Sequence, residues 1–287
     1  QNYNVLGSYL WPNPNGGTTW HVDYVRPTNY SGIISEMKKW TWGRYLWVDA
    51  QFVRSPAFSY TGGPIPADFT LSIAASNPVY YTLNGTDPRA PGGAIAAGAQ
   101  LYSGPIPINS NARVFARARA AAPTWQGINW SGPTVGTYVT ATPKVVITEL
   151  MYNPAPPPAG SLYLSDDFEY VEVKNIGPTS MNLAGFRIRG GLDYAFPNGS
   201  LNAGQAGVIV ANTAAFQSRY GSGPLILGQY TNRLGNEGEH LVLEGSMRET
   251  ILDFDYKDGW YPVRDGLGFS LVVANENGPA TNWGIKQ

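Results

Sequence analysis

The sequence predicts a mainly β fold in which two β-sandwich modules follow a short helical segment. Glycine (34 residues) and proline (23 residues) make up about a fifth of the 287-residue chain, which is typical of short strands joined by many turns. Aromatic residues (13%) are almost as frequent as charged residues (14%). From Phe58 onward, runs of strand-forming residues recur at roughly ten-residue spacing. Helix-rich folds rarely have this combination.

Residues 1–57 are predicted to form a helical and loop segment. Residues 31–52, "SGIISEMKKWTWGRYLWVDAQF", carry apolar residues at a three-to-four spacing, which is typical of one face of a helix. The face comprises Ile33, Met37, Trp40, Val48 and Phe52. Such a face needs a packing partner, because an isolated helix gains little stability in water.

Residues 58–142 are predicted to form the first sandwich. Its strand-like runs are "FTLSIAA", "VYYTLN", residues 99–108, "ARVFARARA" and "VGTYVTA". Side chains alternate between the two faces of a strand. In the fourth run this alternation separates an apolar face (Val114, Ala116, Ala118) from an outer face (Arg113, Phe115, Arg117, Arg119).

Residues 143–287 are predicted to form the second sandwich. Its strand-like runs are "VVITELMY", "FEYVEVKN", "GFRIRG", "AGVIVAN", "HLVLEG", "TILDFDY" and "FSLVVAN". One short helix is expected within residues 212–221, because Asn212 is a good helix N-cap and Gly221 a good terminator.

The charge and composition narrow the possible partners and compartments. A formal net charge of −1 argues against nucleic-acid binding. Without cysteine, the chain has no disulfide, thiolate nucleophile or cysteine-ligated zinc. No apolar run is long enough for a membrane span, and the first thirty residues lack a signal-peptide pattern. A chain that begins at Gln1 is expected to be a processed product or a fragment of a longer protein.

Residues 79–93, "VYYTLNGTDPRAPGG", raise the question of a reactive cluster. Asn84 and Gly85 accept positive φ, Thr86 and Asp87 bond to nearby amides, and Pro88 ends the strand ladder. The favoured interpretation is therefore a turn. The alternative is calcium or ligand binding through Asp87, which requires further oxygen ligands from elsewhere in the chain.

Three aspartates near the end of the chain are the candidate metal ligands. Asp253 and Asp255 share one strand face, and Asp258 follows closely, so the three carboxylates are candidates for a calcium site. A solvated strand face explains them equally well. No catalytic residue is predicted, since the two histidines lie in different modules and no serine lies in a nucleophile-elbow motif.

The outward-facing arginines Arg113, Arg117 and Arg119 are the candidate binding residues. With Phe115 they could form a stripe that binds a polyanion. The favoured alternative is an exposed sheet face whose arginines are balanced by nearby acidic residues and bind no ligand.

The first module carries the residues of a known turn signature. "VYYTLNGTDPRAPGG", followed by "LYSGPIPI" and "VFARARA", resembles the immunoglobulin-like C-terminal module of chitobiases and β-hexosaminidases. The matching residues are Tyr81, Thr82, Gly85, Thr86, Asp87 and Pro88, whereas Asn84 stands where that family usually has Asp. The resemblance implies an immunoglobulin-like sandwich.

The remaining segments resemble two further families. Residues 145–287, from "VVITELMYNP" through "DDFEYVEVKNIGPTSMNLAGFRI" to "DGLGFSLVV", resemble a lamin-tail domain, which is also an immunoglobulin-like sandwich. The stretch from "WPNPNGG" to "WVDAQF" is similar to the C-terminal end of a CotH-type kinase domain, a family related to spore coat protein H. That family's ATP-binding lysine and catalytic aspartates have no counterpart here, so the resemblance implies no kinase activity.

Together these features predict a non-catalytic extracellular structural or interaction protein, a scaffold or accessory subunit of a secreted or surface assembly. The alternative is a substrate- or glycan-binding tail of a larger exported enzyme, either a CotH-type kinase or a glycoside hydrolase. The expected partners are protein subunits, with a glycan as the alternative. No cofactor is expected, and calcium is the alternative left open. The expected location is the exterior or surface of a bacterium, with the periplasm as a further possibility.

Overall fold

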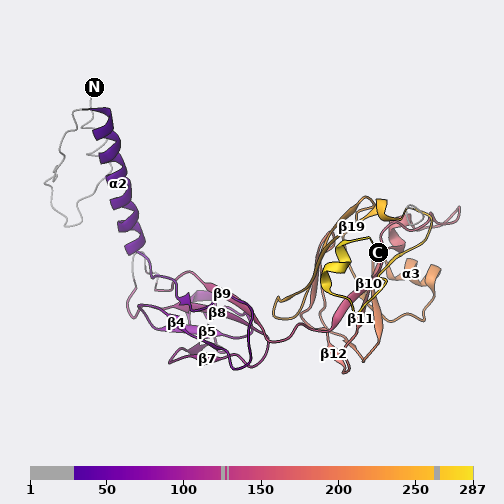
Figure 1. Cartoon of the computed structure of the whole chain (residues 1–287), viewed down its shortest axis with the longest axis horizontal. Helices are drawn as coiled ribbons and strands as arrows, with labels where there is room; N and C mark the ends of the chain where they lie inside the picture. Colours follow the sequence, from indigo (N-terminus) through magenta and orange to yellow (C-terminus); the bar gives the residue numbers. More distant parts are fainter. Residues whose placement is uncertain (1–28, 124–126, 128, 262–265, 287) are drawn as a thin grey trace. The chain divides into compact units, whose positions relative to one another are not determined.

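The computed structural model describes residues 29–123, 127, 129–261 and 266–286 (Figure 1). The chain divides into two compact units, Gln1–Phe52 and Val53–Gln287. Most of the predicted loop that precedes the helix lies outside the described residues.

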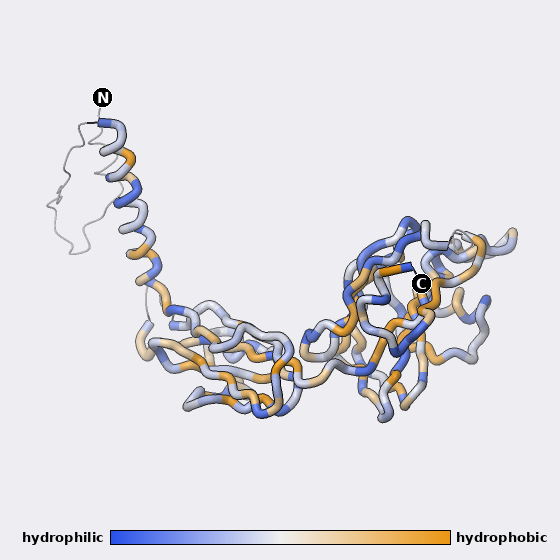
Figure 2. The backbone as a smooth tube through the Cα atoms, viewed as in Figure 1, coloured by the Kyte–Doolittle hydropathy of each residue, from blue (hydrophilic) through white to orange (hydrophobic). Residues whose placement is uncertain are grey.

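The described part of the first unit is one long helix, α2 (Tyr30–Ala50). It begins where expected because the side chain of Asn29 accepts a hydrogen bond from the Gly32 amide at 2.8 Å. Two residues of the predicted apolar face, Met37 and Trp40, are 56% and 43% exposed. Figure 2 shows hydrophobic residues at several turns of α2. No helix in the described ranges has both the length and the apolar character needed to cross a membrane.

The first sandwich consists of short strands around one larger sheet. The strands are β1 (Ala57–Phe58), β2 (Gly63–Pro64), β3 (Thr70–Leu71), β4 (Ile73–Ala74), β5 (Val79–Thr82), β6 (Gln100–Leu101), β7 (Ile106–Pro107), β8 (Ala112–Ala118) and β9 (Thr134–Val139). The larger sheet has the order β2-β9-β8-β5-β6, and β1-β4 and β3-β7 form two-stranded sheets. A 3₁₀ turn (Pro91–Gly93) lies between β5 and β6.

The core of this sandwich follows the predicted alternation of β8. The side chains of Val114, Ala116 and Ala118 are fully buried, whereas the residues between them are half-buried. They belong to the same apolar cluster as Leu71, Ile73, Ile106 and Ile108 of the shorter strands and loops. Val53 also lies in this core, so the packing of the module begins before its first strand.

The second sandwich has two main sheets. Its elements are β10 (Val145–Met151), β11 (Tyr170–Asn175), β12 (Met181–Asn182), β13 (Arg187–Gly190), β14 (Tyr194–Ala195), β15 (Ser200–Leu201), β16 (Ala206–Val210), α3 (Thr213–Tyr220), β17 (Ile226–Gln229), β18 (Gly238–Glu244), β19 (Thr250–Lys257) and β20 (Leu271–Val272). One sheet has the order β17-β16-β11-β10-β20, the other β14-β13-β18-β19, and β12-β15 form a small pair. Three 3₁₀ helices, Ser165–Phe168, Asp258–Trp260 and Ala280–Gly284, complete the described elements.

The predicted short helix is confirmed as α3. Asn212 caps it by accepting hydrogen bonds from the amides of Ala214 (3.0 Å) and Ala215 (3.1 Å), and Gly221 ends it with a positive φ. Its Phe216 packs with Tyr170 in a small apolar cluster, apart from the main core of the module. The fold class predicted from the sequence is thereby confirmed: the chain is mainly β, with a helical segment first.

Candidate functional site

The "TLNGTDPR" segment forms a closed turn. The Thr82 hydroxyl donates to the Thr86 carbonyl at 2.6 Å. The Asn84 side-chain oxygen accepts from both the amide (3.2 Å) and the hydroxyl (2.7 Å) of Thr86, while Gly85 adopts a φ of 77°. These are local side-chain-to-backbone bonds of the kind that specify turns. The favoured structural interpretation agrees with this geometry.

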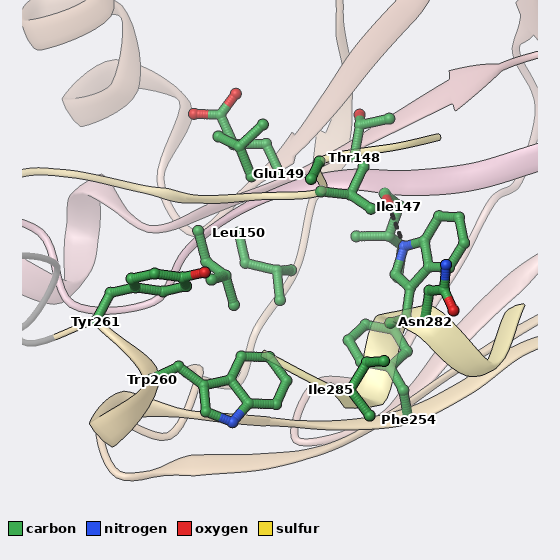
Figure 3. A pocket seen from close by; sticks show the side chains of 14 residues that line it. Ile147, Thr148, Glu149, Leu150, Phe254, Trp260, Tyr261, Asn282 and Ile285 are labelled. Atoms are coloured by element: carbon green, nitrogen blue, oxygen red, sulfur yellow. Dashed lines mark hydrogen bonds between the residues drawn. The ribbon is translucent and has the colours of Figure 1, made fainter. Parts of the chain in front are cut away.

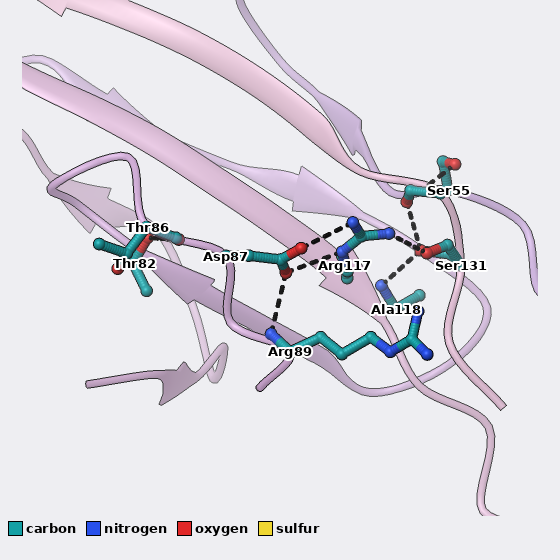
Figure 4. A network of polar contacts seen from close by, with 9 residues as sticks. Ser55, Thr82, Thr86, Asp87, Arg89, Arg117, Ala118 and Ser131 are labelled. Atoms are coloured by element: carbon teal, nitrogen blue, oxygen red, sulfur yellow. Dashed lines mark hydrogen bonds and ion pairs between the residues drawn. The ribbon is translucent and has the colours of Figure 1, made fainter. Parts of the chain in front are cut away.

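An ion pair between Asp87 and Arg117 links this turn to strand β8 (Figure 4). Arg117 donates from Nε and Nη2 to the two carboxylate oxygens, at 2.8 and 2.7 Å. The Arg89 amide also donates to Oδ1 at 2.9 Å, and Arg117 Nη1 donates to the Ser131 carbonyl at 2.7 Å. Burial opposes ionisation of Asp87, but the bonds and charges of Arg117 and Arg89 hold the pKa of this carboxyl below its usual value. The carboxylate of Asp87 and the guanidinium of Arg117 are therefore both held by bonds within the fold.

The other two candidate arginines also have contacts within the first sandwich. Arg113 donates from Nη1 to the Thr137 hydroxyl at 3.0 Å. The guanidinium of Arg119 lies over the Trp130 ring, 5.3 Å from its centroid, and its buried Nε lacks a hydrogen-bond partner within the described residues. The structure brings the three arginines onto one face as the alternation predicts. Their role in binding a polyanion stays a prediction. Part of each guanidinium is already held by these contacts within the fold.

Replacing Arg117 with alanine is expected to destabilise the first sandwich by about 2 kcal/mol, because it removes two charge-assisted hydrogen bonds and leaves Asp87 half-buried without its partner. Arg117→Lys should lose about half as much, since an ammonium cannot bind both oxygens in parallel. Urea unfolding measures both values. Equal stability of wild type and Arg117→Ala would show that the pair contributes nothing net.

The predicted calcium ligands lie on an open strand face. On β19, Asp253 and Asp255 are 56% and 64% exposed, and both contact His240 of β18. The imidazole Nδ1 lies 2.9 Å from Asp255 Oδ1 and its Nε2 lies 3.3 Å from Asp253 Oδ1. Asp258 instead begins a 3₁₀ helix and accepts from the Gly259 amide. In the described part of the chain no three His, Asp or Glu side chains are arranged to hold a metal ion. The geometry therefore gives calcium no support.

The same outer sheet face carries further charge pairs. Arg187 pairs with Asp193, and Arg189 pairs with Glu244 at 2.7 Å. The bonds between Arg187 and Asp193 hold the pKa of that aspartate below its usual value. Opposite charges thus neutralise one another across β13, β18 and β19, on a face that carries the exposed Asp253 and Asp255 and the buried Glu244.

An apolar pocket is lined by strands of both sheets, at the β20 edge of one and the β19 edge of the other (Figure 3). Its volume is about 260 Å³, and β10, β19, β20 and the C-terminal segment line it. Trp260 and Tyr261 lie at one end, and Phe254 and Ile285 lie at the other. The sequence alone did not indicate this pocket, because its lining residues are spread from Ile147 to Ile285.

Strand β20 is the last strand of its sheet and borders this pocket. Leu271 pairs with Leu150 and lines the pocket, while the side chain of Val272 is 52% exposed. The Val273 amide donates to the Thr148 carbonyl of β10 at 3.0 Å. Because backbone groups alternate in direction along a strand, the amide and carbonyl of Val272 point to the free edge. Among the described neighbours, Leu267 and Phe269 are more than 60% exposed.

Two family models match the chain. The model described as Lamin Tail Domain matches residues 139–258, and the model described as Fn3 associated matches residues 69–133. The second module is thus an immunoglobulin-like lamin-tail region, and both matches indicate structural or interaction modules. Among curated proteins, none matches the chain.

Proposed function

We propose that the chain is a non-catalytic structural or interaction protein that works outside the cell, as a scaffold or accessory subunit of a bacterial surface or secreted assembly. The matched families are non-catalytic modules, which supports the absence of an active site. The candidate acidic and basic side chains contact other side chains or the backbone of the fold. The chemistry available on the surface is therefore recognition.

The observation that carries this proposal is the free edge of β20 beside the apolar pocket. An extended segment of a partner protein would add to β20 as a further strand, bonding to the outward amide and carbonyl of Val272. One of its apolar side chains would enter the pocket between Trp260 and Ile285. Main-chain bonds would give affinity and the pocket would give specificity.

Strand β19 is the corresponding edge of the other sheet, and it is less suited to this role. Its exposed side chains are all polar, with Asp253, Asp255 and Lys257 at every second position. Charged side chains on an edge strand oppose pairing with another chain. Around β20 the exposed residues are instead apolar, including Val272 and Phe269.

Selection of a random peptide library against the immobilised chain tests the proposal. We expect peptides with alternating apolar residues to be enriched. Val272→Pro should weaken the selected peptides about tenfold or more, because proline removes the outward N–H and leaves the bonds to β10 intact. Val272→Thr keeps that N–H and is the matched control. Peptides that bind Val272→Pro as well as wild type would contradict the proposal.

The alternative function is a glycan-binding tail of a larger exported enzyme, as the resemblances to CotH-type kinases and chitobiases imply. Co-sedimentation with insoluble chitin and with purified bacterial cell wall separates the two functions. Retention on either polysaccharide without peptide enrichment would favour the alternative. The docking proposal predicts that the chain stays in the supernatant.

A further inference from the structure

The Asn-Gly pairs of this chain differ in their exposure and in the hydrogen bonds that hold them. The sequence has four, at Asn15, Asn84, Asn198 and Asn277, and the first lies outside the described residues. We infer that Asn198, followed by Gly199, is a site of spontaneous deamidation in the folded protein, and that the fold protects Asn84 and Asn277.

The reaction needs only the chain and water. The backbone nitrogen of the glycine attacks the side-chain carbonyl carbon of the asparagine, and a nitrogen–carbon bond forms that closes a five-membered ring. The carbon–nitrogen bond of the side-chain amide breaks, and the nitrogen leaves as ammonia with the proton of the glycine amide. One water then opens the ring at either carbonyl and gives aspartate or isoaspartate. Glycine favours the attack because it has no Cβ to hinder it.

Asn84 is held away from this reaction. Its side-chain oxygen accepts two hydrogen bonds from Thr86, which orient the amide toward that residue. The following Gly85 is packed against Arg113, whose Cδ lies 2.7 Å from the position of an added Cβ. Ring closure requires the side chain to rotate, so both bonds to Thr86 would have to break first.

Asn277 is protected through its glycine. The Gly278 amide donates to the Asn275 carbonyl at 3.1 Å. The Asn277 amide donates to the Asn275 side chain, also at 3.1 Å, so the turn is bonded twice. The attacking nitrogen must lose its proton, and here that proton is already engaged in a hydrogen bond.

Asn198 has neither form of protection. Its side chain is exposed, and within the described residues it makes no hydrogen bond. The amide of Gly199 likewise has no acceptor among them, although its carbonyl accepts from the Leu183 amide at 2.9 Å. Gly199 has a φ of 109°, a backbone region that larger residues rarely adopt. The pair therefore combines an unhindered nitrogen with a free side chain.

The product would alter the entry to β15. Deamidation adds one negative charge to the exposed turn. The isoaspartate form also lengthens the backbone by one methylene, two residues before Ser200 and Leu201 pair with β12. Because Leu201 is fully buried, the longer backbone is expected to loosen this edge of the second sandwich.

Ageing the intact chain at mildly alkaline pH, followed by tryptic peptide mass spectrometry, tests the inference. The three described pairs fall in separate peptides, residues 55–89, 190–219 and 265–286. We expect the conversion of Asn198 to be about tenfold faster than that of Asn84, since two hydrogen bonds must break at Asn84. Asn198→Gln should abolish conversion in its peptide, while Asn84→Gln leaves it unchanged.

Two further samples decide whether the fold sets this order of conversion rates. In urea the three rates should converge, and Thr86→Ala should speed conversion at Asn84 in the folded chain, because it removes one of the two bonds. The inference is overturned if Asn84 or Asn277 converts as fast as Asn198 in the folded chain. It is also overturned if the same order persists in urea, since local sequence would then explain it.

Discussion

Trp283→Ala is expected to lower the free energy of unfolding of the second sandwich by about 3–5 kcal/mol. Trp283 is only 6% exposed and belongs to the main core of the module. Its indole Nε1 donates to the Ile147 carbonyl of β10 at 2.7 Å. Alanine would leave a cavity beside the existing pocket and a buried carbonyl without its donor.

Trp283→Phe separates these two causes, because it keeps most of the packing and removes only the hydrogen bond. We expect it to cost about 1–2 kcal/mol. Pulse proteolysis in urea measures both variants in the whole chain. A loss below about 1 kcal/mol for Trp283→Ala would show that the C-terminal 3₁₀ helix does not close the sandwich.

Strand positions in both modules were predictable because alternation and turn residues are local signals. In "ARVFARARA" the buried positions are those that the pattern assigned to the core, and Asn212 and Gly221 delimit α3 as expected. The two-residue strands such as β12 and β14 were not predicted, since two residues carry no periodicity.

The candidate sites were less predictable because they depend on which strands become neighbours. Asp87 and Arg117 are thirty positions apart, and only the pairing of β5 with β8 brings them together. The pairing of β18 with β19 likewise places His240 between two aspartates that the sequence suggested as metal ligands. The sequence supplied the ionisable groups, but strand register determined their partners.

Glu169 is the group from which we expect the strongest pH dependence of stability. It is fully buried, and its Oε2 accepts from the Leu234 amide at 2.9 Å and the Tyr230 hydroxyl at 3.2 Å. Its Oε1 has no hydrogen-bond partner within the described residues. Burial is the main cause that raises the pKa of this carboxyl to about 8, and the nearby charge of Asp166 raises it further. The hydrogen bonds from Leu234 and Tyr230 act in the opposite direction but do not offset the burial.

The sign follows from comparing the folded and unfolded chains. Below pH 4.5, the ordinary pKa of a glutamate side chain, both states hold the proton, and stability does not depend on this group. Between pH 4.5 and about 8 the unfolded chain releases the proton while the folded chain keeps it, so stability falls as the pH rises. The total loss from this group is expected to be about 5 kcal/mol, at about 1.4 kcal/mol per pH unit over this range.

Glu169→Gln removes the titration and keeps an oxygen that can accept from Leu234. Its stability should therefore vary little over this range, and at pH 8 it should exceed that of wild type by a few kcal/mol. Tyr230→Phe is the control, because it removes one bond to the carboxyl but leaves the titrating group in place. Urea unfolding at a series of pH values gives the slopes. Parallel curves for wild type and Glu169→Gln would contradict the prediction. They would show that the pKa of Glu169 is the same in the folded and unfolded chains.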